Sequence, residues 1–196
     1  MIYMNKPELR SELKAKQASR SYSDVENLSK AICKRVLEYV EWDKVKNLHC
    51  YTPAQNRGEV ECWEILEFVW VNHPHIQVFL PARPNESPYL GYPVTRDSEL
   101  FIDDFGLSYP NTEAEEVPQL DLIIVPMLGF NRQLYRLGQG GGFYDRFLKN
   151  HTSASKIGLA WEESLINDLP VESHDVPLDV IFTQKHLRTS KQQSKN

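Results

Sequence analysis

The segment Arg136-Leu-Gly-Gln-Gly-Gly-Gly-Phe-Tyr-Asp-Arg-Phe-Leu148 holds four of the nine glycines of this 196-residue chain. It follows a short apolar run, Leu120-Asp-Leu-Ile-Ile-Val-Pro126, which has the length and composition of a buried strand. It leads into residues 143–149, which read as a helix. A strand, a glycine-rich turn and a helix in this order are typical of an α/β fold, in which ligands collect beyond the carboxyl ends of the strands.

Further strands and helices are predicted on both sides of this segment. Asn5 and Glu8 have the spacing of a capping box, with Pro7 in the first turn, so a helix is predicted to begin there. A second capping pattern at 23–26 predicts another helix, whose apolar residues recur at three- and four-residue steps. The remaining predicted elements are strands at 48–52, 76–81, 120–126, 157–161 and 180–183 and helices at 61–71 and 143–149.

This alternation predicts one domain over residues 1–188, a three-layer α/β/α fold whose mainly parallel sheet is covered on both faces. Residues 89–110 break the alternation and predict a small antiparallel insertion. Residues 189–196 are polar and predict a frayed tail. The loops at 52–57 and 161–163 each follow a predicted strand, so we expect them to share a site with the glycine-rich turn.

The composition narrows the class of protein. A chain with 41% hydrophobic and 25% charged residues is globular, and a net charge of −5 gives no support to a nucleic-acid-binding surface. The three cysteines lack a CxxC pair, which favours reduced thiols. No stretch approaches the roughly 20 apolar residues of a membrane span, and the N-terminus lacks the apolar core of a secretory signal. We therefore expect a cytoplasmic monomer with no nucleic-acid or membrane partner.

The glycine loop, residues 138–142, has the chemistry of a phosphate site. Glycines let the backbone turn sharply and bring bare N–H groups against a ligand, and the positive end of a helix dipole favours phosphate. Arg136 and Arg146 supply positive charge, and Asp145 is a hard oxygen ligand suited to magnesium. The segment matches neither the pattern GxxxxGK[ST] nor the fingerprint GxGxxG.

As a whole, the motif Arg-Leu-Gly-x-Gly-Gly-Gly-Phe-Tyr-Asp resembles the signature of the 5-formyltetrahydrofolate cyclo-ligase family, also called methenyltetrahydrofolate synthetases. The resemblance extends over nearly the whole chain. The basic segment from Lys6 to Arg10, the pair Gly58-Glu59 and the segment from Ser173 to Asp179 all look like family features. Two positions differ, since many relatives have Phe-Asp where this chain has Phe130-Asn131, and a glycine where it has Leu134.

The resemblance implies an ATP- and magnesium-dependent closure of 5-formyltetrahydrofolate to 5,10-methenyltetrahydrofolate, with release of ADP and phosphate through a phosphorylated formyl intermediate. It implies catalytic roles for Arg136 and Asp145, and magnesium ligands at Asp145 and Asp175. Glu59, Phe143 and Tyr144 would bind the folate. The residues expected to bind ATP are Lys6, Arg10, Arg136, Gly138, Gln139, Gly140, Gly141, Gly142 and Tyr144. Because Arg136 would meet phosphate rather than core, we expect Arg136→Ala to cripple turnover and leave the fold intact.

Each residue also has a structural interpretation. Asp145 would suit the first turn of any helix, Asp175 a turn before Pro177, and Phe143 and Tyr144 a core at a helix start. The basic N-terminal helix would suit a solvated face. Only the combination of residues favours the functional interpretation.

Two other functions stay open. A non-catalytic folate- or nucleotide-binding protein on the same scaffold is the main alternative, motivated by Asn131. A phosphosugar isomerase or acyl-transfer enzyme on a similar scaffold is the other, although the sequence presents no evident base or nucleophile for it.

Overall fold

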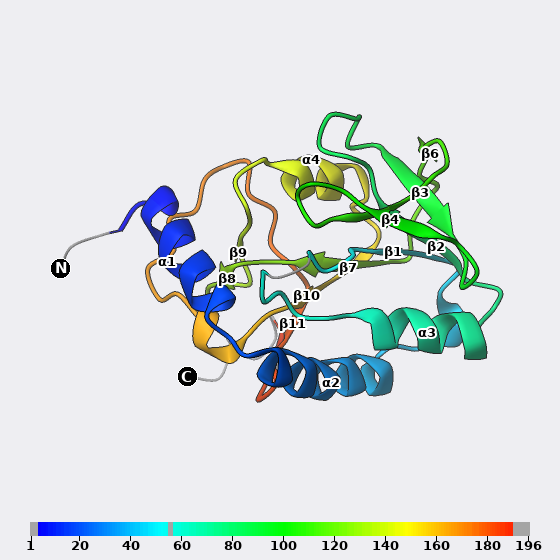
Figure 1. Ribbon diagram of the computed structural model, residues 1–196. Helices are drawn as coiled ribbons and strands as arrows, with labels where there is room; N and C mark the ends of the chain where they lie inside the picture. The colour runs from blue at the N-terminus through cyan, green and yellow to red at the C-terminus, as the bar shows by residue number, and fades with distance from the viewer. Residues whose placement is uncertain (1–3, 55–56, 190–196) are drawn as a thin grey trace.

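The computed structural model describes residues 4–54 and 57–189. Within them the main sheet has eight strands in the order β12-β11-β10-β7-β1-β2-β3-β6 (Figure 1). The central strands β11, β10, β7, β1 and β2 run parallel, and the outer strands β3, β6 and β12 run antiparallel to their neighbours. The strands of this sheet are β1 (Asn47–Cys50), β2 (Gln77–Pro81), β3 (Leu90–Val94), β6 (Glu115–Glu116), β7 (Leu122–Pro126), β10 (Ser155–Leu159), β11 (Val180–Phe182) and β12 (Leu187–Thr189).

Helices cover both faces of the sheet, which confirms the predicted three-layer α/β/α fold. One face packs against α2 (Tyr22–Tyr39) and α3 (Trp63–Asn72), and the other packs against α4 (Phe143–Asn150). Strand β7 shows why, since Leu122 and Ile124 belong to the first core and Ile123 and Val125 to the second. Successive side chains of a strand point to opposite faces of the sheet, so a strand that is apolar throughout contributes to the core on each face.

Helix α1 (Lys6–Ala18) lies at the side of this sandwich (Figure 1). The predicted capping box is confirmed, because the Asn5 side chain accepts from Glu8 N and the Glu8 carboxylate accepts from Asn5 N. Its apolar residues Leu9 and Leu13 form a small separate core with residues near the glycine loop, namely Leu128, Leu137 and Leu169. This core holds the basic face of α1 beside the carboxyl ends of the strands.

The predicted insertion at 89–110 is antiparallel, as expected. β3 extends the main sheet beside β2, and β4 (Leu100–Ile102) pairs with β5 (Ser108–Pro110) in a separate hairpin. A further small sheet, unexpected from the sequence, joins β8 (Gly129–Phe130) to β9 (Arg136–Leu137). Two 3-10 turns complete the described elements, at Trp42–Lys44 and Glu162–Ser164.

Several predicted boundaries differ from the observed ones by one or two residues. Helix α2 begins at Tyr22, because the Ser21 hydroxyl, rather than Ser23, accepts from the backbone N–H of Asp24 at 3.1 Å. Thr189 is not part of a frayed tail, since it pairs with Val180 as the last residue of β12. The rest of that predicted tail, 190–196, lies outside the described residues, and so do two positions of the predicted loop at 52–57.

Candidate active site

A cavity of about 640 Å³ opens at the carboxyl ends of β1, β2 and β7. This is the place where α/β sheets bind ligands. Every residue to which the resemblance assigns a role lines this cavity, although these residues come from four separate segments of the chain. They are Lys6, Arg10, Glu59, Arg136, Gly138, Gln139, Gly140, Gly141, Gly142, Phe143, Tyr144, Asp145 and Asp175.

The glycine loop has the open backbone that the sequence predicts. Gly140 and Gly142 have φ of +105° and +66°, which favour glycine over residues with a Cβ. Gly142 is the N-cap of α4, and because it has no side chain, it cannot cap the first-turn N–H groups itself. No heavy atom lies within 4 Å of where a Cβ would stand on Gly138 or Gly141. The loop is therefore open to a ligand along its exposed side.

Arg136 lines the cavity, but its side chain is almost completely buried. Its side chain is only 4% exposed; Nη2 donates to Asp145 Oδ1 at 2.6 Å and Nη1 donates to the Val176 carbonyl at 2.8 Å. Burial lowers the pKa of the guanidinium, and the Asp145 carboxylate opposes that effect. The premise that Arg136 meets phosphate rather than core is wrong in part, because the buried arginine joins β9 to α4 and to the 172–176 loop.

The two carboxylates assigned to magnesium differ in their availability. Asp145 accepts from Arg136 through Oδ1 and is 22% exposed, and no hydrogen bond to Oδ2 occurs among the described residues. Asp175 accepts from Lys6 Nζ through both oxygens, at 3.1 and 2.8 Å. Burial raises the pKa of Asp175, but the contact with Lys6 outweighs this effect and the pKa is lowered. Burial lowers the pKa of Lys6, but its acidic partners outweigh this effect and the pKa is raised. Asp145 therefore has one oxygen open to a metal ion, whereas Asp175 would have to give up its bonds to Lys6 before it could bind one.

Residues 4–54 and 57–189 hold no cluster of three or more His, Cys, Asp or Glu that could bind a metal ion. Magnesium nonetheless fits one or two carboxylates when phosphate oxygens and waters complete its coordination. The open oxygen of Asp145 meets that requirement.

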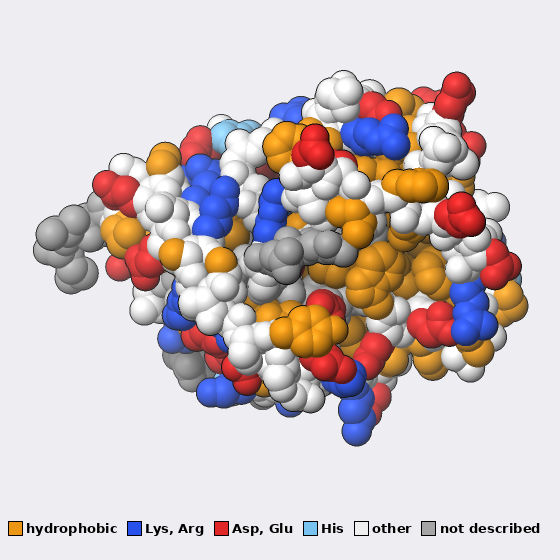
Figure 2. All heavy atoms as spheres, in the orientation of Figure 1, with side chains coloured by type: hydrophobic (Ala, Val, Ile, Leu, Met, Phe, Trp, Pro, Cys, Tyr) orange, Lys and Arg blue, Asp and Glu red, His pale blue; other side chains and the backbone are white. Residues whose placement is uncertain are grey.

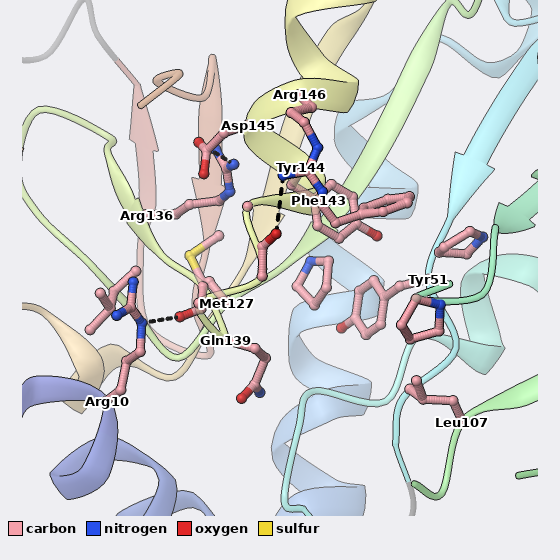
Figure 3. Close-up of a pocket in the computed structure, with 18 of the residues that line it drawn as sticks. Arg10, Tyr51, Leu107, Met127, Arg136, Gln139, Phe143, Tyr144, Asp145 and Arg146 are labelled. Carbon is pink, nitrogen blue, oxygen red and sulfur yellow. Dashed lines mark hydrogen bonds and ion pairs between the residues drawn. The ribbon is translucent and has the colours of Figure 1, made fainter. Parts of the chain in front are cut away.

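The opposite end of the cavity is aromatic and apolar. Figure 3 shows Tyr51 and Leu107 across the cavity from Arg10 and Arg136, with Gln139 between them. The Tyr144 hydroxyl is buried and has no hydrogen-bond partner within the described chain, and burial raises its pKa. Phe143 stacks on Phe147 with ring centroids 5.6 Å apart. This end suits a flat heteroaromatic ligand.

Glu59 is held at the border between the two ends. Its carboxylate accepts from Ala54 N at 2.8 Å and from the Gln139 side chain at 3.3 Å. Burial raises its pKa, in opposition to these hydrogen bonds. The loop beside it is tightly packed, since a Cβ on Gly58 would lie 2.1 Å from the Gln17 carbonyl oxygen.

The loop at 161–163, which the sequence predicts to share the site, lies outside the cavity. Trp161, Glu162 and Glu163 do not line the cavity. Trp161 is buried behind the Glu59 loop, where Nε1 donates to the Gly58 carbonyl at 2.9 Å, and Arg20 lies over its ring. This loop therefore supports the wall of the cavity from outside.

Sequence reasoning missed several lining residues. Most of them are apolar or aromatic residues without a motif, and the antiparallel hairpin contributes Phe105, Leu107 and Tyr109. The exposure of Phe105, at 65%, is unusual for so large an apolar side chain. Figure 2 shows that hydrophobic side chains gather on one side of this face, and Lys and Arg side chains gather near α1 on the other.

Both residues that depart from the expected family pattern lie in the turn that precedes the motif. Leu134 has φ of +65°, in the left-handed region where glycine is ordinarily preferred. Its side chain is buried in the core that packs against α4. Asn131 is buried, and its Oδ1 accepts from Tyr135 N at 3.0 Å. An amide oxygen supplies the acceptor that a carboxylate would supply, so the turn is kept.

Solved structures of two named enzymes share this fold. The NMR structure of Aquifex aeolicus 5,10-methenyltetrahydrofolate synthetase matches with a TM-score of 0.79 and 30% identity, over 96% of this chain and 94% of that one. The synthetase from Mycoplasma pneumoniae matches with a TM-score of 0.67 and 26% identity, over 92% and 99%. The fold is therefore that of the methenyltetrahydrofolate synthetases.

The sequence comparisons agree with the structural ones. The 5-formyltetrahydrofolate cyclo-ligase of Haemophilus influenzae is 27% identical over 185 residues, which are 91% of this chain and 97% of that protein. The Escherichia coli (strain K12) cyclo-ligase is 32% identical over 133 residues, 64% of this chain and 72% of that one. A model of the 5-formyltetrahydrofolate cyclo-ligase family matches residues 3–184. The chain belongs to this family of enzymes, as its motif indicated.

Proposed function

We propose that the protein closes 5-formyltetrahydrofolate to 5,10-methenyltetrahydrofolate in an ATP- and magnesium-dependent reaction that releases ADP and phosphate. The observation that carries this proposal is a single cavity with a basic, glycine-rich end, an aromatic end, and the half-buried carboxylate of Glu59 at the border between them. The first end suits the phosphates of a nucleotide, and the second suits a pteridine ring.

The chemistry explains why both ends must meet in one cavity. A formyl amide is a poor electrophile because its nitrogen donates into the carbonyl. Transfer of the γ-phosphoryl group to the formyl oxygen gives a phosphorylated formyl intermediate, in which that oxygen is a good leaving group. The second folate nitrogen then attacks the activated carbon, and phosphate departs. The protein must mainly position the two substrates and neutralise charge.

The residues divide these tasks between them. Lys6, Arg10 and the glycine loop would hold the nucleotide phosphates, while Glu59, Phe143 and Tyr144 would hold the pteridine. Magnesium would bind the open oxygen of Asp145, with Asp175 as a second ligand, and would neutralise phosphate charge. Arg136 would fix the Asp145 carboxylate through the 2.6 Å contact, in addition to the phosphate contact that the motif implies.

We further propose that the enzyme acts as a cytoplasmic monomer. The residues to which the resemblance assigns a role come together in the cavity of a single chain. Cys33, Cys50 and Cys62 are free and buried, which suits a reducing compartment. None of the helices in the described part of the chain is long and apolar enough to cross a membrane.

The test is to mix the purified protein with 5-formyltetrahydrofolate, ATP and magnesium and to follow the near-ultraviolet absorbance of the methenyl product. Omission of ATP is the control. Growth of the chromophore only with ATP supports the proposal. Binding of ATP without any chromophore would contradict it and favour a non-catalytic binding protein.

A further inference from the structure

Among the described residues, five Lys and Arg side chains line the cavity, and two of them are neutralised by the protein itself. Lys6 is bound to Asp175 and Glu172, and Arg136 is bound to Asp145. The three that form no ion pair with any described residue are Arg10, Arg57 and Arg146. Arg57 donates to the Phe105 carbonyl, at the aromatic end. The uncompensated charge near the glycine loop therefore belongs to Arg10 and Arg146.

Arg10 and Arg146 both contact the glycine loop, and they reach it from different elements. Arg10, on α1, donates through Nε to the Gly138 carbonyl at 3.0 Å. Arg146, on α4, donates through Nη1 to the Gly141 carbonyl at 3.2 Å (Figure 3). Each bond ties up a carbonyl of the loop and leaves the other N–H groups of a guanidinium free.

The two glycines with positive φ lie directly against these guanidinium groups. A Cβ on Gly140 would stand 3.4 Å from Arg10 Cζ, and a Cβ on Gly142 would stand 2.9 Å from Arg146 Nη1. The absence of side chains thus lets both arginines lie close to the loop backbone. An anion seated on the loop would meet a guanidinium at either end.

We infer that Arg146 is a phosphate-binding residue, which with Arg10 forms a clamp around the anion that the glycine loop holds. The inference rests on the proposed function, because it takes the phosphates of ATP as the ligand. Arg136 cannot supply this charge so freely, since its side chain is buried and engaged with Asp145 and Val176. A guanidinium that bonds a loop carbonyl and a phosphate oxygen together would also set the distance between them.

The test compares Arg146→Ala with Lys149→Ala, which removes an exposed cation from the same helix but outside the cavity. Calorimetric titration with ATP, ADP and AMP measures binding without catalysis. We expect Arg146→Ala to weaken ATP binding by about tenfold or more, the scale of one charge-assisted hydrogen bond. We expect AMP binding to change much less, and Lys149→Ala to change neither. Arg146→Lys, which keeps the charge but not the fork, should fall between.

Unchanged ATP binding in Arg146→Ala would overturn the inference. Equal weakening of ATP and AMP would also overturn it, because a merely collapsed loop would affect both nucleotides alike. Failure of the proposed function can be distinguished from failure of this inference. In that case the natural protein would form no methenyl chromophore, whatever the binding result with Arg146→Ala. Equal melting temperatures of Arg146→Ala and the natural protein are expected, since Arg146 is exposed.

Discussion

The Gln139 side chain donates to the Glu59 carboxylate at 3.3 Å, and so joins the glycine loop to the loop that follows β1. The two residues are 80 positions apart. This contact lies at the border between the basic and aromatic ends of the cavity, so the charge of Glu59 contributes to the electrostatics of both ends.

Replacement of Glu59 by glutamine should stabilise the protein and impair folate binding. Burial raises the pKa of Glu59, so its charged form is disfavoured in the folded state. That penalty is absent well below the usual pKa of 4.5, grows as the pH rises from 4.5 to the raised pKa of Glu59, and is complete above it. Glu59→Gln should therefore melt at a higher temperature at pH 7 but not at pH 4. A gain of ~1 kcal/mol would be about 2–4 °C in a chain of this size. An equal gain at both pH values would contradict the explanation.

Replacement of Arg136 by alanine should lower both stability and activity. The change leaves Asp145 with a poorly compensated charge and removes the bond to Val176, at a cost of about 3 kcal/mol. Arg10→Ala is the matched control, because Arg10 is only half-buried and makes one hydrogen bond to the loop. Thermal melting measures the difference, and equal melting temperatures for the two variants would argue against a structural role of Arg136.

Asparagine at position 145 should shift the magnesium dependence of turnover. The amide oxygen can still accept from Arg136, but the charge that faces the cavity is lost. We expect the magnesium concentration for half-maximal rate to rise at least about tenfold, or roughly 1.4 kcal/mol of binding free energy. Asp168→Asn, an exposed residue outside the cavity, is the control. A superimposable titration for Asp145→Asn would remove this residue from the metal site.

Alanine at Gly58 should be far more damaging than alanine at Gly141. Gly58 has φ of +64° and a Cβ there would clash with the backbone of Gln17, whereas a Cβ on Gly141 meets no atom within 4 Å. We expect Gly58→Ala to cost more than about 2 kcal/mol and Gly141→Ala to leave the unfolding midpoint in denaturant nearly unchanged. Similar midpoints for the two variants would show that the loop can relax.

The sequence predicted the central sheet well because its signals are local. Apolar strands such as β7 and amphipathic helices such as α2 have their own periodicity, and the glycine motif lies directly after a strand. The edge strand β6 consists of Glu115 and Glu116, both exposed, and has no such pattern. The β8–β9 hairpin depends on Leu134 in a backbone conformation that its side chain disfavours. Neither could be predicted from periodicity.

The motif predicted which residues line the site, but it did not predict which charged residues form ion pairs with one another. Lys6 and Asp175 were both assigned to ligands, and the structure joins them to each other. The burial of Arg136 depends likewise on Asp145 and on the Val176 carbonyl, 40 positions away. Such pairings follow from how distant segments pack, and one sequence contains no signal for that packing.

The packing of α1 has a consequence for the order of events during synthesis. The helix is made before its partners, since Asp175 follows Lys6 by 169 positions, and Leu9 and Leu13 pack in a core that includes Leu169. Because domains form as their segments become available, the central strands can assemble while α1 still lacks its partners. The cavity is thus completed by a helix that is made before its partners and takes its place only after they have been made.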